Sequence, residues 1–234
     1  MNRDFLYLIW KDPRTRRNFT IGKLSREDSY YTFKYEHDSI RAEEYGWQKL
    51  SAFPDDKKLY RSKTMFPVFS SRLPDRRRKG IEKILEKYGL TEFDKYELLK
   101  KSGARLPIDT YEFIDPIFPE EETVQRDFYV MGIRHYAPCN GENCSDLTGI
   151  EIGDHLFFEE EPTNEHDPLA IRVINKNGDH LGYVPRYYNE EIINRLHKGM
   201  TYSCMVIEVN LNVADNCSEC IKVQLVMPNP KENS

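Results

Sequence analysis

Long hydrophobic runs are absent from this sequence of 234 residues. No stretch approaches the roughly 18 consecutive apolar residues of a membrane-spanning helix, which excludes a helical membrane protein. Near the N-terminus, the apolar run FLYLIW (5–10) is only six residues long and lies between Asp4 and Asp12. That pattern indicates a β-strand rather than a signal peptide. We therefore expect a cytoplasmic protein that does not bind membranes.

Familiar catalytic and phosphate-binding motifs are absent as well. The sequence contains no GxGxxG, GxxxxGK[ST], GxSxG or HExxH pattern. It therefore gives no sign of a phosphate-cradling loop, a hydrolase nucleophile or a zinc protease helix. Internal repeats are missing too. We expect a protein that is not an enzyme.

Net charge is only −5, but it is divided unevenly along the chain. Residues 1–115 carry 25 Lys and Arg against 19 Asp and Glu, a net charge of +6. Residues 116–234 carry 9 against 20, a net charge of −11. This asymmetry suggests two domains with different electrostatic roles. Because duplex affinity comes mostly from phosphate contacts, a nucleic-acid site in the acidic half must be a small, shaped pocket.

The cysteines are few, and in a cytoplasmic protein we expect them to be reduced. Four of the five form two close pairs, spaced C-x4-C and C-x2-C: Cys139 with Cys144, and Cys217 with Cys220. If the two loops meet, four thiolates could hold a zinc ion tetrahedrally. The simpler alternative is four unligated thiols in polar loops. Cys204 lies in an apolar run and is expected in the core.

The first half predicts a small α+β module over residues 1–115. Alternating aromatic and β-branched residues predict a three-stranded sheet of residues 5–10, 19–24 and 30–35, and a further strand at 110–115 closes the module. Apolar spacing and stop residues predict helices at 65–74, 76–90 and 94–103. The Pro- and Glu-rich segment 116–126 is interpreted as a linker.

The second half, residues 127–228, is rich in predicted strands. They cover residues 127–136, 154–161, 169–174, 180–185, 202–213 and 219–227. A single amphipathic helix is expected at 189–199, and the tail 229–234 is expected to fray. Six short strands with one helix in about 100 residues favour a small, partly open barrel over a sandwich.

The densest group of polar side chains in this half lies in EEPTNEHDPLAIRV (160–173), where Asn164, His166 and Asp167 precede a buried strand. Asn and Asp side chains bond backbone N–H groups and fix turns, so these residues could simply shape the loop. The alternative is a binding site. The residues alone leave both interpretations open.

Family resemblance favours the binding site. The stretches VMGIRHY (130–136), GDHLFFEEEPTNEHDPLAIRV (153–173) and HLGYVPRYYNEEIINRLHKG (180–199) resemble the HIRAN domain in order and spacing. The resemblance implies an OB-like barrel that binds single-stranded DNA and its free 3′ end. It also implies the DNA-binding residues, with Asp167 accepting the 3′-hydroxyl: Arg134, His135, Asn164, His166, Asp167, Tyr183 and Arg186. His135 and His166 stand where eukaryotic members have tyrosines, which implies weaker, pH-sensitive stacking.

The first half resembles the N-terminal subdomain of HipA-like kinases. The stretches that carry the resemblance are IGKLS (21–25), YTFKY (31–35), MFPVFSSRLPDRRRKGIEKILEKYGL (65–90) and DKYELLKKSGARLP (94–107). In the full kinases a catalytic domain follows at once. In split systems this subdomain is a separate chain that restrains the kinase, beside a helix-turn-helix DNA-binding protein.

The resemblance thus implies an antitoxin-like regulatory subunit, whose partner is a HipA-like kinase lacking its own N-terminal subdomain. Aromatic and Arg residues anchor interfaces, so we expect the partner surface at the helix over 65–73 and at the basic start of the next helix: Phe66, Phe69, Arg76, Arg77 and Arg78. The alternative to DNA recognition is a protein-interaction scaffold, which the acidic second half favours.

Overall fold

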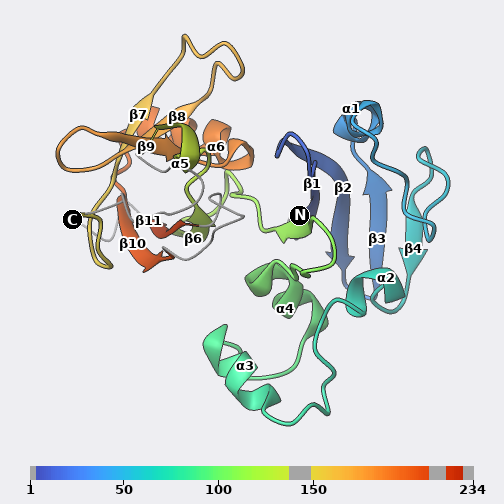
Figure 1. The fold of residues 1–234 in the computed structure, drawn as a ribbon. Coiled ribbons are helices and arrows are strands. Elements are labelled where there is room, and N and C mark those ends of the chain that lie inside the picture. Colours follow the sequence, from blue (N-terminus) through green and yellow to red (C-terminus); the bar gives the residue numbers. More distant parts are fainter. Residues whose placement is uncertain (1–3, 137–148, 211–219, 229–234) are drawn as a thin grey trace. The chain divides into compact units, whose positions relative to one another are not determined.

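The computed structural model describes residues 4–136, 149–210 and 220–228. The chain divides into two compact units, Met1–Pro116 and Ile117–Ser234. Both mix strands and short helices, which confirms the α+β class (Figure 1).

Unit one is built on a five-stranded antiparallel sheet in the order β4-β3-β2-β1-β5 (Figure 1). Its strands are β1 Phe5–Lys11, β2 Asn18–Glu27, β3 Tyr30–Tyr35, β4 Tyr60–Ser62 and β5 Tyr111–Ile114. The expected three-stranded sheet is therefore too small. Strand β4 is only three residues long, which is too short to show an alternating pattern, and the closing strand β5 pairs with β1.

Aromatic rings fill the core of this unit. The ring of Phe53 lies 4.4 Å from that of Phe33 and 5.1 Å from that of Phe66, and the rings of Phe69 and Phe113 are 5.0 Å apart. Phe66 and Phe69 are only 8% and 2% exposed. The prediction that these two residues bind a partner is therefore wrong, because their rings pack against side chains from the sheet and its loops.

Four helices accompany the sheet: α1 Asp38–Glu44, α2 Pro67–Ser70, α3 Ile81–Lys87 and α4 Lys95–Ser102. The prediction for residues 94–103 is confirmed down to its ends. Asp94 caps α4 by accepting from the N–H groups of Tyr96 and Glu97, and Gly103 ends it with a φ of 67°. Helix α2 is much shorter than expected for 65–74.

The basic run Arg76-Arg77-Arg78-Lys79 does not open a helix, contrary to the prediction. It forms exposed turns, and α3 begins only after Gly80, whose φ of 82° is left-handed and breaks the helical path. The four charges therefore lie on a turn before α3, where they are all solvent-exposed.

The described residues of unit two form two three-stranded antiparallel sheets, β10-β11-β6 and β7-β8-β9. The strands are β6 Val124–Tyr129, β7 Phe157–Glu160, β8 Ile171–Ile174, β9 His180–Tyr183, β10 Ser203–Val209 and β11 Ile221–Met227. Isolated bridges from Met131 to Tyr183 and from His155 to Met205 join the sheets. Two sheets linked at such corners form the partly open barrel that the strand pattern predicts.

Gly182 makes one of these corners. A Cβ at this position would lie 2.3 Å from the carbonyl oxygen of Met131, and the φ of Gly182 is 154°. Met131 and Tyr183 exchange two backbone hydrogen bonds of 2.8 Å beside it. A side chain at Gly182 would push these two segments apart.

Among the described residues of the unit there are also two helices, α5 Ile133–Tyr136 and α6 Arg186–His197. The strand expected at 127–136 is partly wrong, since β6 ends at Tyr129 and the last residues turn into α5. Gly132, with a φ of 77°, lies between the two elements. This turn places α5 beside β9 (Figure 1).

The segment 116–126 is not the free linker that its composition indicates. Arg195 of α6 is 2% exposed, and its Nη2 donates to the carbonyl oxygens of Phe118 and Glu121, each 2.8 Å away. Residues 124–126 already belong to β6. A buried guanidinium therefore ties this segment to the body of unit two.

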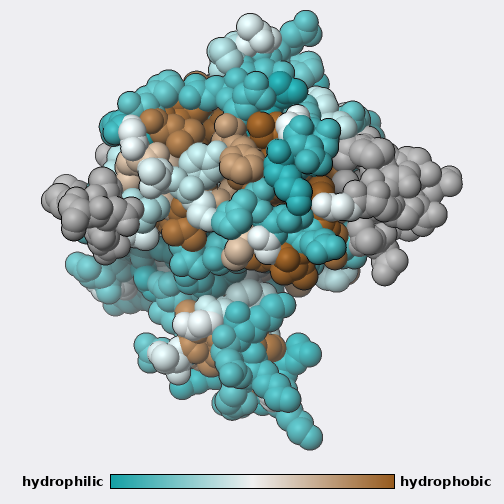
Figure 2. Space-filling model, turned by 90° about the vertical axis from the view of Figure 1, so that its left-hand side faces the viewer, coloured by the Kyte–Doolittle hydropathy of each residue, from teal (hydrophilic) through white to brown (hydrophobic). Residues whose placement is uncertain are grey.

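No helix in the described part of the chain is long and apolar enough to cross a membrane. On the face of the described residues that Figure 2 presents, hydrophobic areas are separated from one another by hydrophilic side chains.

Candidate nucleic-acid interface

Asn164 organises the loop between β7 and β8. Its Oδ1 accepts from the backbone N–H groups of His166, at 2.9 Å, and Asp167, at 3.2 Å. Its Nδ2 donates to Oε2 of Glu161, at 2.7 Å, and to the hydroxyl of Tyr183, at 3.3 Å. The amide therefore fixes a turn and also connects that turn to strand β9.

Asp167 lies on the same loop, with 15% of its side chain exposed. Its Oδ1 accepts from the N–H of Leu169 at 3.0 Å, and its Oδ2 accepts from Nδ2 of Asn189 at 3.2 Å. The Nε of Arg186 is 3.4 Å from the same Oδ2, and the Arg186 side chain is 67% exposed. Asp167 thus shapes the loop and also leaves part of its carboxylate open to solvent beside an exposed guanidinium.

Three aromatic rings gather beside this loop. The ring of Tyr136 lies 4.1 Å from that of His180 at an angle of 33°, and 5.2 Å from that of Tyr183. The rings of His180 and Tyr183 are 4.9 Å apart and nearly perpendicular. Tyr136 is 46% exposed, so this aromatic cluster presents a ring to solvent.

Four of the residues expected to bind DNA come together through the contacts described above: Asn164, Asp167, Tyr183 and Arg186. His166 is exposed, and its backbone rather than its ring carries the contact with Asn164. His135 is exposed on α5, and Arg134 lies on the same helix.

Sequence reasoning missed Tyr136 and His180. Tyr136 directly follows the expected Arg134-His135 pair, but the choice between neighbouring side chains depends on the turn into α5. His180 begins strand β9 three residues before Tyr183. A strand pattern alone gives it no more weight than any other polar position.

The surroundings of Glu161 and Tyr183 keep these two groups in their usual charge states. Hydrogen bonds from Asn164 and Tyr183 lower the pKa of Glu161, so this carboxylate is ionised at neutral pH. Burial raises the pKa of Tyr183, and its contacts with Tyr136 and Glu161 raise it further. Tyr183 therefore remains a neutral donor, whose hydroxyl lies 2.7 Å from Oε2 of Glu161.

Burial also lowers the pKa of His180, and the charge of Arg172 lowers it further. The imidazole is thereby kept neutral at physiological pH, with its Nε2 3.0 Å from the carbonyl oxygen of Gly182. A neutral ring is suited to stacking on a nucleic-acid base.

Of the predicted zinc ligands, Cys139, Cys144 and Cys217 lie outside the described residues. Cys220 is fully buried just before β11. Within residues 4–136, 149–210 and 220–228, no three His, Cys, Asp or Glu side chains are grouped to hold a metal ion. The four-cysteine zinc site stays a prediction.

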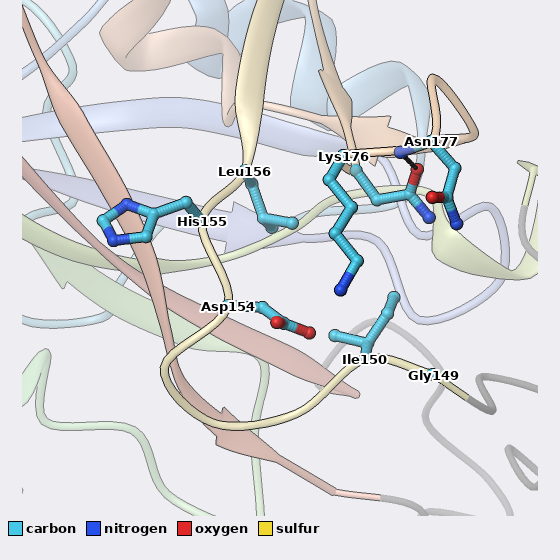
Figure 3. Close-up of a pocket in the computed structure, with 8 residues that line it drawn as sticks. Gly149, Ile150, Asp154, His155, Leu156, Lys176 and Asn177 are labelled. Carbon is cyan, nitrogen blue, oxygen red and sulfur yellow. Dashed lines mark hydrogen bonds between the residues drawn. The ribbon is translucent and has the colours of Figure 1, made fainter.

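A small hollow lies apart from this loop, between residues 149–156 and the turn 175–177 (Figure 3). Asp154, Ile150 and Lys176 point into it, and the N–H of Asn177 donates to Oδ1 of Asn175 at its edge. Its interior of about 10 Å³ matches a single water molecule. It is too small to be a ligand site.

Comparison with known families identifies the two units. Residues 125–226 match the model of the HIRAN domain, and residues 16–107 match that of the HipA N-terminal domain. The protein therefore combines a HipA N-terminal domain with a HIRAN domain, and both resemblances found in the sequence are confirmed.

Solved structures similar to this chain include HIRAN domains. The HIRAN domain of human HLTF is 16% identical, with 47% of this chain and 83% of that one covered and a TM-score of 0.36. A protein from Lactobacillus plantarum is 22% identical, with 45% and 94% covered and a TM-score of 0.35. The HLTF HIRAN domain in its DNA-bound conformation is 15% identical, with 47% and 79% covered and a TM-score of 0.30. No curated protein sequence matches the chain.

Proposed function

We propose that the HIRAN domain binds single-stranded DNA at a free 3′ end. The observation that carries this proposal is the position of Asp167, whose partly exposed carboxylate lies 3.4 Å from the exposed guanidinium of Arg186. A carboxylate accepts a hydrogen bond from a 3′-hydroxyl, and a guanidinium pairs with the adjacent phosphate. A 3′-phosphate at the same place would meet the carboxylate as a like charge.

The aromatic cluster supplies the third part of such a site. Tyr136, His180 and Tyr183 offer ring faces for the terminal base, and base–aromatic stacking contributes about 1–3 kcal/mol per base without sequence preference. The match of residues 125–226 to the HIRAN family supports a DNA-binding role, because another HIRAN domain, that of HLTF, has a DNA-bound conformation. With a net charge of −11 over residues 116–234, we expect weak, end-specific binding rather than broad affinity for DNA.

Fluorescence anisotropy at low, fixed salt tests this proposal with 5′-labelled oligonucleotides that end in a 3′-hydroxyl or a 3′-phosphate. The wild-type protein should prefer the 3′-hydroxyl, and Asp167→Asn should lose the preference while it retains the fold. Glu165→Gln, which removes one charge from an exposed position on the same loop, is the matched control. Equal affinity of the wild type for both ends would contradict end recognition.

For the first domain, we propose a non-enzymatic, antitoxin-like role as the regulatory subunit of a split HipA-type kinase. The support is the order of domains: the HipA N-terminal match ends at residue 107 and a HIRAN domain follows from 125, where the full kinases have their catalytic domain. The proposed partner is a HipA-like kinase that lacks its own N-terminal subdomain. A helix-turn-helix DNA-binding protein would complete the system.

Since Phe66 and Phe69 are in the core, the proposed partner surface is limited to the exposed basic turn at 76–79. Co-purification with a HipA-like kinase encoded beside this protein is the direct test. Replacing Arg76, Arg77 and Arg78 with Ala should weaken the complex. Replacing the exposed Lys57, Lys58 and Lys63 with Ala is a control of equal charge. Failure of the wild type to associate would contradict the regulatory role.

A protein-interaction scaffold is the second candidate function, and the charge of the HIRAN domain favours it. Glu159, Glu160 and Glu165 are exposed around the candidate site and would repel a phosphate backbone. In that case the wild type would bind no oligonucleotide at low salt but would still capture the kinase.

A further inference from the structure

The outer face of the sheet β7-β8-β9 carries a row of side chains that leads away from the aromatic cluster. Phe157 in β7 pairs with Ile174 in β8, and Ile174 pairs with His180 in β9. Cross-strand partners project from the same face of a sheet. The neighbouring Val173 and Leu181 are buried, and a register shift between Val173 and Ile174 leaves Leu181 without a paired residue in β8. The side chains of Phe157, Ile174 and His180 therefore form an outward-facing row across three strands.

Phe157 stands out in this row because 46% of it is exposed. The next residue, Phe158, is packed instead: its ring stacks on that of Tyr202, with centroids 4.6 Å apart and planes 7° from parallel. Strand β7 thus uses one of two adjacent rings for packing and leaves the other at the surface.

The row is continuous with the candidate DNA site. His180, at its β9 end, belongs to the aromatic cluster with Tyr136 and Tyr183, and Tyr183 contacts Asn164 on the loop. Two strand spacings of about 4.8 Å separate the ends of the row, a span of roughly 10 Å. Stacked bases are about 3.4 Å apart along one strand, so this span corresponds to about three base steps.

Charge indicates which part of a nucleic acid the row would meet. Glu159, two residues from Phe157 on the same face, is exposed, and its Oε2 is 3.3 Å from Nη1 of Arg172 in the partner strand. A phosphate group would be repelled by this carboxylate, which is only partly compensated. A base offers a π-face to Phe157 and carries no charge. Bases rather than phosphates therefore fit this face.

We propose that Phe157 is a second stacking platform, which takes the base of a nucleotide two or three positions before the 3′ end. The proposal rests on the DNA-binding function proposed above and extends the site from one nucleotide to about three. Single-stranded DNA would run from Asp167 past the aromatic cluster to the edge strand β7, with its bases toward the sheet.

Oligonucleotide length tests the platform. Anisotropy should compare 5′-labelled DNA of two and of six nucleotides, each with a 3′-hydroxyl, on the full-length protein. Phe157→Leu, which keeps an apolar side chain but removes the ring, should weaken binding of the hexamer about tenfold and leave the dimer unchanged. Ile152→Ala changes another exposed apolar residue, 69% exposed and outside the row, and should leave both affinities unchanged.

A tryptophan at the platform gives a second measurement. In Phe157→Trp, a bound hexamer should quench the new fluorescence, and a hexamer without bases at its third and fourth positions from the 3′ end should not. The two native tryptophans, Trp10 and Trp47, belong to the first domain and supply the background in the wild type.

The outcomes separate this proposal from the function on which it rests. If the hexamer binds with its 3′-hydroxyl preference but Phe157→Leu has no effect, the platform is refuted and end recognition stands. If the wild type binds neither oligonucleotide, both proposals fail, and the row becomes a candidate surface for a protein partner.

Discussion

Nδ2 of Asn189 in α6 donates to Oδ2 of Asp167 across 3.2 Å, which ties the helix to the loop that holds the candidate DNA site. Asn189 is 3% exposed, and its Oδ1 has no hydrogen-bond partner among the described residues. A buried amide of which only one polar atom is hydrogen-bonded contributes little to stability. We therefore expect the main role of Asn189 to be the orientation of the Asp167 carboxylate.

Asn189→Ala should therefore affect DNA binding more than folding. Loss of a hydrogen bond to a charged group costs about 1.5–3 kcal/mol, but removal of the unpaired Oδ1 offsets much of that cost. We expect the free energy of unfolding to fall by only about 1 kcal/mol, while the preference for a 3′-hydroxyl over a 3′-phosphate decreases severalfold. Urea denaturation and anisotropy measure the two effects. A large loss of stability with an unchanged end preference would show a purely structural role.

Arg195 should be among the residues on which the HIRAN domain depends most for stability. Arg195→Met leaves the carbonyl groups of Phe118 and Glu121 and the carboxylate of Glu191 without their buried donor. Removing one partner of a buried charged network costs about 3–5 kcal/mol. Thermal and urea unfolding should show this loss, whereas Lys198→Met, at an exposed position three residues on, should change stability by less than about 0.5 kcal/mol.

Gly182→Ala should separate the two sheets at their corner. The new Cβ would lie 2.3 Å from the carbonyl oxygen of Met131, and the left-handed φ adds strain of about 1–3 kcal/mol. Gly178→Ala is a matched control, because its φ of 85° is also left-handed but nothing lies within 4 Å. We expect a larger loss for Gly182→Ala in urea denaturation, together with faster amide exchange at Met131 and Tyr183. Equal losses would mean that φ strain alone accounts for the effect.

Cys204 should be unreactive in the folded protein. It is 1% exposed, and burial raises the pKa of its thiol to about 12, so almost no thiolate forms at pH 8. Alkylation with iodoacetamide followed by peptide mass spectrometry should leave Cys204 unmodified in native protein and modify it fully in denaturant. Native-state labelling comparable to that of the denatured chain would contradict the packing of β10.

The imidazole of His180 should titrate below the usual pKa of 6.5, because burial and the charge of Arg172 disfavour its protonated form. A lowered pKa in the folded state means that the unfolded chain binds this proton more readily. The contribution to stability is therefore intact above pH 6.5 and is lost as the pH falls through the folded pKa. Titration of the ring protons by NMR measures this value.

The other charged or titratable groups around His180 are Tyr136, Glu159, Glu161 and Tyr183. Arg172→Leu should raise the pKa of His180, because it removes the nearby positive charge. A pKa at or above 6.5 in the wild type would show that the ring is more hydrated than its packing against Tyr136 implies.

Local patterns in the sequence were sufficient for several elements. The sequence predicts both ends of helix α4. Asp94 is a strong N-capping signal before its short apolar pattern, and Gly103 is a strong C-capping signal after it. The loop at Asn164 and Asp167 was found because turn-forming side chains are crowded into a few residues. Family resemblance identified both domains for the same reason, since its motifs are contiguous stretches of chain.

Other elements depended on contacts between residues far apart in sequence. The apolar spacing of α3 continues to the edge of the basic turn and therefore predicts a helix there, and only the backbone at Gly80 reveals the break. Phe66 and Phe69 had the composition of an interface, but their contacts with Phe53 and Phe113 place them in the core. The sequence alone does not distinguish an aromatic residue in the core from one in an interface.

The two domains, most of their strands, the capped helix α4 and the polar loop can be predicted from the sequence, because each depends on residues that are neighbours along the chain. The side chains that surround that loop are set instead by the packing of segments far apart in the chain. The turn at Gly132 brings Tyr136 to His180, and the strand register aligns Phe157 with Ile174 and His180. These choices follow from strand pairing and burial, which are properties of contacts between distant segments and so are not encoded in any single stretch.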